Sequence, residues 1–378
     1  MMATRSLPTL DLKRNYRRIR EEIAEAMDEV LESQHFILGP AVGAFEKEVQ
    51  SYLEVPHAIG CASGSDALLL ALMALDLREG DEVITTPYSF FATVSSITRL
   101  GGRPIFVDID PETYNLRMDQ VLEKISPRTR AILPVHLFGQ MAEVELLDPV
   151  LREGRLRLVE DCAQSFGAWR RIDGRLARSG SVGSLGCFSF FPTKNLGCYG
   201  DGGMISSTDD ALATRLRRLR VHGAEETYFH QEVGLNSRLD TLQAAILRVR
   251  LRHLEEWNEE RRLAAERYRI LFEERGLLDA LTPPAEDPQN YHIYHQYVIR
   301  CSRRDDLQAF LGAEGITSRV YYPLGLHLQP CFRFLGGQEG DYPEAERLSR
   351  ESLALPIFPE ITPEEQEWVV NTIRRFYD

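Results

Sequence analysis

Short apolar segments alternate with helical patterns through the first half of the chain, and this alternation constrains the fold more than any other feature. Four segments have the length of buried strands: residues 83–85, 105–107, 131–135 and 156–159. Each is followed by a stretch in which apolar residues recur at helical spacing. Strands that alternate with helices form a mainly parallel sheet covered on both faces. We therefore predict an α/β fold.

Two further helices are predicted outside this alternation. Residues 14–33 carry apolar side chains at helical spacing, and a Gly-Pro turn at Gly39-Pro40 ends the pattern. A long helix is expected from about Leu239 to Glu274, with apolar residues near one stripe and many Arg and Glu on the other. We expect this second helix to carry the chain out of its large domain.

The predicted domain boundary lies in that long helix. Residues 1–250, with the N-terminal helix, form a large domain, and residues 251–378 form a smaller α+β domain. After a linker that contains Pro283-Pro284, the smaller domain is predicted to begin with a strand, a helix and a strand at residues 296–300, 305–312 and 317–321.

Composition excludes several classes of protein. A net charge of −13 argues against a nucleic-acid surface. The longest apolar stretch, Ala67 to Leu75, is too short to span a bilayer, and the first residues lack the apolar core of a signal peptide. Six cysteines without a C-x-x-C pair are expected to be reduced core thiols. We expect a cytoplasmic protein without membrane or nucleic-acid partners.

Lys194 is the first candidate for chemistry, because it lies in the apolar, glycine-flanked stretch Cys187–Gly197. Such surroundings disfavour an ammonium ion unless the amine is committed, for example to a Schiff base. The alternative is a solvated loop lysine. Asp161 ends an apolar strand 33 residues upstream and could hold a protonated ring nitrogen. Its alternative is the cap of a following helix.

Pyridoxal 5'-phosphate needs an amine, a carboxylate, a stacked aromatic ring and phosphate donors. The segment Cys61–Ala67 opens an apolar helix and could bind phosphate through free N–H groups, although Ser63 or Ser65 could instead cap that helix. An aromatic cluster at Thr86–Thr93 follows a strand, on the sheet edge where ligands bind in α/β folds. Core packing is the alternative for its rings.

The order and spacing of these and other segments resemble the DegT/StrS group of sugar-nucleotide aminotransferases, which are fold-type I pyridoxal phosphate enzymes. The resemblance covers nearly the whole chain. The matching segments are Thr9–Leu12, Phe36–Pro40, Val159–Gln164, Ser189–Asn195, Gly200–Gly203, Arg220–Gly223, Gly234–Asp240, Gln243–Ala245, Val320–Pro323 and His327–Pro330.

The resemblance implies a role for each matching position. Lys194 would bind the cofactor covalently and shuttle the proton, and Asp161 would pair with the ring nitrogen. Gln164 would lie beside the phenolic oxygen and Phe90 would cover the ring. Ser65, Asp66 (through its backbone) and Ser189 would contact the phosphate, and Asn236 would reach the cofactor phosphate of a neighbouring subunit. The resemblance therefore implies a homodimer with shared active sites.

The reaction implied is a transamination from an amino acid, expected to be L-glutamate, to a keto sugar on a nucleotide diphosphate. Likeness of Tyr228–Gly234 to one branch of the family favours C3 of a dTDP or UDP sugar. The products would be amino sugars for surface polysaccharide or natural products. A sugar dehydratase is one alternative, but relatives of that kind have histidine in place of Lys194. A ligand-binding or regulatory relative without catalysis is the other.

Other residues give weaker indications. Tyr322 and His327 lie in the segment that matches the family's substrate side, with loop packing as the alternative. Arg238, next to Asn236, is expected to contact substrate phosphates or to bridge subunits. His292 and His295 are three residues apart at the expected start of a strand, where their side chains would point to opposite faces. We expect no metal site.

Overall fold

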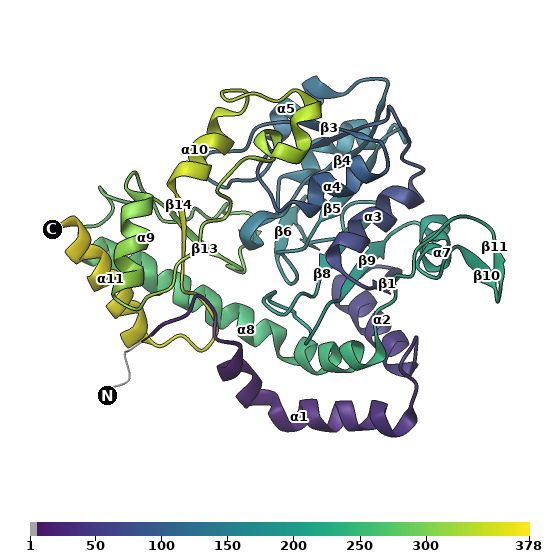
Figure 1. Ribbon diagram of the computed structural model, residues 1–378, viewed down its shortest axis with the longest axis horizontal. Helices are drawn as coiled ribbons and strands as arrows, with labels where there is room; N and C mark the ends of the chain where they lie inside the picture. The colour runs from purple at the N-terminus through teal and green to yellow at the C-terminus, as the bar shows by residue number, and fades with distance from the viewer. Residues whose placement is uncertain (1–5) are drawn as a thin grey trace.

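The structure is a computed structural model that describes residues 6–378. Its centre is a seven-stranded sheet (Figure 1). In spatial order the strands are β1 (His57–Cys61), β9 (Gly203–Ser207), β8 (Leu185–Ser189), β5 (Arg157–Asp161), β4 (Thr129–Leu133), β2 (Glu82–Thr85) and β3 (Arg103–Phe106). β9 is antiparallel to both of its neighbours, and all other pairs are parallel. The predicted mainly parallel sheet is confirmed.

Helices cover both faces of this sheet, because successive strand residues point to opposite sides. One face packs against α3 (Gly64–Ala74), α4 (Ala92–Arg99) and α7 (Asp210–Leu219) and includes Val83 and Val159. The other face packs against α2 (Pro40–Leu53), α5 (Met118–Lys124) and α8 (Thr241–Glu274), with α6 (Asp148–Leu151) nearby, and includes Ile84, Leu158 and Met204. Each such aliphatic side chain, fully buried, stabilises the fold by about 1.5–3 kcal/mol.

Both predicted long helices are confirmed. α1 (Leu12–Ser33) is capped by Asp11, whose carboxylate accepts from the N–H groups of Lys13 and Arg14, and it lies alongside α8 (Figure 1). The Gly39-Pro40 pair has a second role, which its sequence did not predict. Pro40 is the first residue of α2, a favourable position since its missing N–H would have no helical partner.

The C-terminal part has a core of its own, to which the second half of α8 contributes Ala264, Tyr268 and Phe272. The elements of this part are β13 (Tyr297–Arg300), α9 (Arg304–Ala313), α10 (Pro343–Glu351), β14 (Ser352–Leu355) and α11 (Pro363–Tyr377). β13 pairs with β14. The predicted boundary at residue 250 falls inside α8, and the division into two domains stays a prediction.

The strand predicted at residues 317–321 is wrong. Only Arg319 pairs there, through an isolated bridge to Ala354 of β14. The Tyr88 hydroxyl instead binds the next part of the segment, because it donates to the Tyr321 carbonyl and accepts from the Tyr322 N–H. These bonds direct the chain towards the carboxyl ends of the central strands.

Two small sheets complete the fold. β12 (Asn290–Tyr291), β6 (Trp169–Ile172) and β7 (Arg175–Arg178) form one, and β10 (Ala224–Glu226) with β11 (Phe229–His230) forms a hairpin that projects from the body (Figure 1). Across residues 6–378, no helix is both long and apolar enough to cross a membrane. The cytoplasmic location stays a prediction. All six cysteines are free, and five of them are buried as predicted, whereas Cys331 is exposed and departs from the predicted core position.

Candidate active site

A cavity of about 620 Å³ lies at the carboxyl ends of the central strands, where the sequence predicts a ligand. Its wall combines side chains from the start of α3, the turn before α4, the ends of β5 and β8, and the Tyr321-Tyr322 segment. The predicted site residues in this wall are Ser65, Phe90, Asp161, Gln164, Ser189, Lys194 and Tyr322. The fold thus brings together residues that are up to 257 positions apart, from 65 to 322.

The N-terminus of α3 forms one end of the cavity. Ser63 caps the helix, because its hydroxyl accepts from the Asp66 N–H at 3.1 Å. The N–H groups of Gly64 and Ser65 have no acceptor in the helix and can bind an anion. A Cβ on Gly64 would lie 2.5 Å from the Ser189 Cβ, so only glycine lets the helix start approach this strand end. Gly64 thus keeps two groups of phosphate donors together.

Asp66 lies outside this arrangement. Its N–H is used by the Ser63 cap, it is absent from the cavity wall, and its carboxylate accepts from the Ser237 hydroxyl at 2.7 Å. The capping alternative is therefore confirmed for Ser63, and the backbone contact predicted for Asp66 has no support in this geometry.

Asp161 is the last residue of β5 and is 3% exposed. Its carboxylate accepts from the Thr93 hydroxyl at 2.8 Å and from the Ala163 N–H at 3.2 Å. Burial raises the pKa of Asp161, against the lowering effects of these bonds and of the Lys194 charge. No helix follows β5 before β6, so the alternative role of Asp161 as a helix cap is wrong.

Lys194 lies in the turn after β8, where its N–H donates to the Phe191 carbonyl at 2.8 Å. Burial lowers the pKa of its ammonium to about 8, and the Asp161 charge acts in the opposite direction. A substantial fraction of neutral, nucleophilic amine is therefore present near pH 8. Such an amine is suited to form a Schiff base, as the apolar surroundings of Lys194 predict.

A family model for the DegT/DnrJ/EryC1/StrS aminotransferase family matches residues 17–374. The chain belongs to this family. A relative from Geobacillus stearothermophilus, named pleiotropic regulatory protein, is 48% identical and aligns over 98% of this chain and 99% of its own length. The UDP-N-acetyl-3-dehydro-alpha-D-glucosamine 3-aminotransferase of Acidithiobacillus ferrooxidans is 42% identical over 99% of both chains.

The crystal structure of DesV from S. venezuelae, in complex with a ketimine intermediate, has the same fold. It matches with a TM-score of 0.94 and 39% identity, over 99% of both chains. The predicted fold-type I aminotransferase architecture is thus confirmed.

In this DegT/StrS family member, Gln164 has a fixed orientation. Its Oε1 accepts from the Phe138 N–H at 2.8 Å, so its Nε2 is the group that donates to the Tyr322 hydroxyl, also at 2.8 Å. Phe90 is 57% exposed at the cavity wall, so one of its faces is free to stack on a ring.

Besides Asp66, three more predicted residues lie outside the described cavity wall. His327 is buried and its Nε2 lies 3.1 Å from Glu346, which is the packing alternative. Asn236 is exposed and Arg238 half-exposed, whereas Ser237 between them is buried against the start of α3. Alternate residues of an extended segment point to opposite sides, so Asn236 and Arg238 face away from their own cavity.

Among the residues of the cavity wall that were not predicted, Thr93 and His295 bear most directly on the site. Thr93 belongs to the predicted aromatic cluster, in which only the rings were considered as cofactor contacts. His295 was considered only as a metal ligand, but it lines the cavity with its Nδ1 3.0 Å from Asn195 Oδ1. Because Asn195 Nδ2 donates to the Ile293 carbonyl, its Oδ1 is the acceptor and His295 Nδ1 carries the hydrogen.

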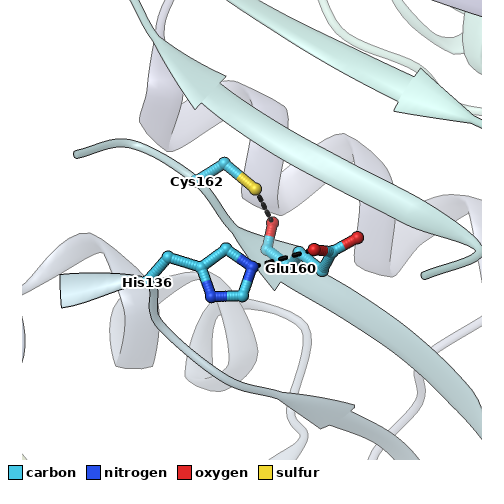
Figure 2. A group of neighbouring side chains, drawn as sticks. All are labelled: His136, Glu160 and Cys162. Atoms are coloured by element: carbon cyan, nitrogen blue, oxygen red, sulfur yellow. Dashed lines mark hydrogen bonds and ion pairs between the residues drawn. The ribbon is translucent and has the colours of Figure 1, made fainter. Parts of the chain in front are cut away.

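Behind Asp161, on the opposite side of β5, lie His136, Glu160 and Cys162, the types of residue that bind metals (Figure 2). The Glu160 carboxylate already accepts from His136 Nε2 and from the N–H groups of residues 180, 182 and 183, at 2.7–3.1 Å. His136 Nδ1 accepts from the Ala142 N–H. With these lone pairs used, we interpret the group as an internal anchor for the end of β5.

The donor set fits pyridoxal phosphate. A carboxylate with a raised pKa, a lysine with a lowered pKa, and free N–H groups beside a small residue are brought into one cavity. A positive ring nitrogen would offset the cost of burying the charged form of Asp161.

Proposed function

We propose that the protein is a pyridoxal phosphate-dependent aminotransferase that acts on a keto sugar carried by a nucleotide diphosphate. The observation that supports it most strongly is the convergence of Lys194 and Asp161 in one cavity, next to the helix start at Gly64 and Ser65. Family membership agrees with this chemistry.

Each residue of the cavity has a task in this proposal. The bound cofactor would supply an electron sink for the carbon that loses a proton. Lys194 Nζ takes that proton and returns it, as a general base and acid with a pKa near 8. Asp161 keeps the ring nitrogen protonated, and the start of α3 with Ser189 binds the phosphate. Phe90 excludes water from one face of the ring.

The proposed acceptor is a 3-keto sugar on UDP or dTDP, and the proposed donor is L-glutamate. The relative from A. ferrooxidans is named for amination at C3 of a UDP sugar, which supports this position. Lys194 supports transfer over dehydration, because a proton-shuttling lysine is what transfer needs.

A regulatory role is the second candidate, since the relative from G. stearothermophilus is named as a regulatory protein. The side chains of the cavity argue against a purely regulatory protein. A non-catalytic protein has no need for an amine whose pKa is lowered beside a buried carboxylate.

We also propose a homodimer with shared active sites. Among the described residues of the cavity wall, Lys194 is the one cation, whereas Asp161 and Asp201 are acids. A cofactor phosphate and a sugar diphosphate need more positive charge, which Arg238 of a second copy would supply. An apolar groove of about 590 Å³ between α1 and the lysine turn, lined by Tyr16, Tyr199 and other residues, offers a surface for that copy.

The experiment incubates the protein with L-glutamate and each member of a panel of keto sugars on UDP or dTDP. The release of 2-oxoglutarate measures turnover, and the mass of the product identifies the amination. We expect amination of a 3-keto sugar and loss of turnover in Lys194→Ala. A colourless protein that stays colourless with added pyridoxal phosphate would favour the regulatory candidate. Ultracentrifugation with absorbance would show a dimer whose cofactor retention falls in Asn236→Ala.

A further inference from the structure

Tyr322 and Gln164 form a pair of hydrogen-bond donors whose direction is fixed by the backbone. The Phe138 N–H can only donate, so it assigns oxygen to Gln164 Oε1 and nitrogen to the atom that faces Tyr322. Gln164 Nε2 then donates to the Tyr322 hydroxyl at 2.8 Å. The tyrosine oxygen is therefore an acceptor in this bond, and its own hydrogen remains to be donated.

Among the described residues, the hydroxyl of Tyr322 is hydrogen-bonded to Gln164, which donates, so the tyrosine hydrogen has no acceptor. Gln164 Nε2 has a second hydrogen as well. Both residues line the cavity, and Gln164 is 7% exposed. The half-buried Tyr322 presents its unused hydrogen to the cavity, where it is available to a ligand. Two unused hydrogens on neighbouring atoms match an oxygen anion.

Burial raises the pKa of Tyr322 above its usual range, so the phenol stays protonated. It is therefore a donor at every pH at which the protein would work, and not a base. The Tyr88 hydroxyl bonds both to the carbonyl and to the N–H of the Tyr321-Tyr322 peptide, which fixes the ring beside Gln164.

We propose that Tyr322, together with Gln164, donates a hydrogen bond to the phenolic oxygen of the cofactor, and that Tyr322 is a cofactor-binding residue more than a sugar-binding one. This inference rests on the proposed function, because it requires pyridoxal phosphate in the cavity. The two donors hold the oxygen as its anion, which would lower the pKa of the phenol and set the colour of the bound cofactor.

The test compares pyridoxamine phosphate, which binds without a covalent bond, with its 3-deoxy analogue, which lacks the phenolic oxygen. Titration of the apoprotein with each gives two dissociation constants. Tyr322→Phe is expected to weaken pyridoxamine phosphate about tenfold and to leave the analogue unchanged. Tyr342→Phe, which removes a hydroxyl outside the cavity wall, is the matched control and should change neither.

A second variant covers the case in which Tyr322→Phe does not fold. In Gln164→Glu, a carboxylate would accept the Tyr322 hydrogen and withdraw it from the ligand, so the preference for pyridoxamine phosphate over its analogue should fall by a similar factor. In both variants the absorbance of bound pyridoxal phosphate should shift to that of the protonated phenol.

Equal weakening of both ligands, or no change in either, would overturn the inference and leave the proposed function intact. A raised KM for the sugar with unchanged cofactor binding would likewise overturn it and assign Tyr322 to the substrate. Failure of the unaltered protein to bind either ligand would overturn both proposals.

Discussion

The hydroxyl of Thr93, on α4, donates to Oδ2 of Asp161, at the end of β5, across 2.8 Å in a fully buried contact. Ser89 lies 2.8 Å from the same hydroxyl. Since Thr93 gives its hydrogen to the carboxylate, Ser89 donates to Thr93. The charged form of Asp161 therefore depends on a short chain of two hydroxyls, in a place where burial acts against it.

Thr93→Val should raise the pKa of Asp161 further and destabilise the apoprotein by about 1–2 kcal/mol at neutral pH. A raised carboxyl pKa in the folded state makes the charged form costly at high pH, and this cost disappears as pH falls below that pKa. The deficit should thus be larger at pH 7.5 than at pH 5 in urea unfolding. Thr98→Val, whose hydroxyl bonds only to carbonyls of the same helix, is the control and should show no such pH dependence.

Covalent capture of pyridoxal phosphate should speed up with pH through a midpoint near 8, because only the neutral amine of Lys194 attacks. With that pKa, about a tenth of the amine is neutral at pH 7, against on the order of one part in three thousand for an ordinary lysine. Stopped-flow absorbance of the apoprotein measures the rate. A midpoint above pH 10 would contradict the effect of burial on Lys194.

Gly64→Ala should weaken binding of pyridoxamine phosphate at least tenfold, because the added Cβ would lie 2.5 Å from Ser189 and separate the phosphate donors. Gly43→Ala, on α2, is the matched control, since a Cβ there meets nothing within 4 Å. This control should keep full affinity and gain up to about 1 kcal/mol from helix propensity. Calorimetric titration and thermal unfolding separate the two effects.

Glu160→Gln should destabilise the protein by about 3 kcal/mol, because an amide N–H₂ would replace one of two oxygens that together accept four hydrogen bonds. Glu48→Gln removes an exposed ion pair with Arg248 and should cost less than about 1 kcal/mol. If zinc raised the melting temperature of the unaltered protein through this group, the interpretation as an anchor would be wrong.

Periodicity predicted the sheet and the long helices well, because strands buried on both faces and long amphipathic helices leave strong patterns. The error at residues 317–321 has a tertiary cause. A tyrosine 233 positions away binds that backbone, and no local pattern reports it. The start of α2 was not predicted, because a Gly-Pro pair can mark the end of one helix and also the beginning of the next.

The predictions of site residues succeeded and failed for similar reasons. Lys194 and Asp161 were found because a charged residue in an apolar segment is conspicuous. The burial of His327 and the orientation of Gln164 depend on hydrogen bonds between separate segments of the chain, so sequence alone could not predict them. The use of the Asp66 N–H by Ser63 is a local contact, which the capping alternative had offered. Thr93 carried no signal beyond its place in the aromatic cluster.

The central claim is a covalent link at one lysine, and the composition makes it easy to test. The chain has four lysines, Lys13, Lys47, Lys124 and Lys194, and the first three are exposed. Borohydride reduction of the protein with stoichiometric pyridoxal phosphate, followed by peptide mass spectrometry, should place the label on the peptide that contains Lys194. Label spread over the three exposed lysines, or no label at all, would contradict the account.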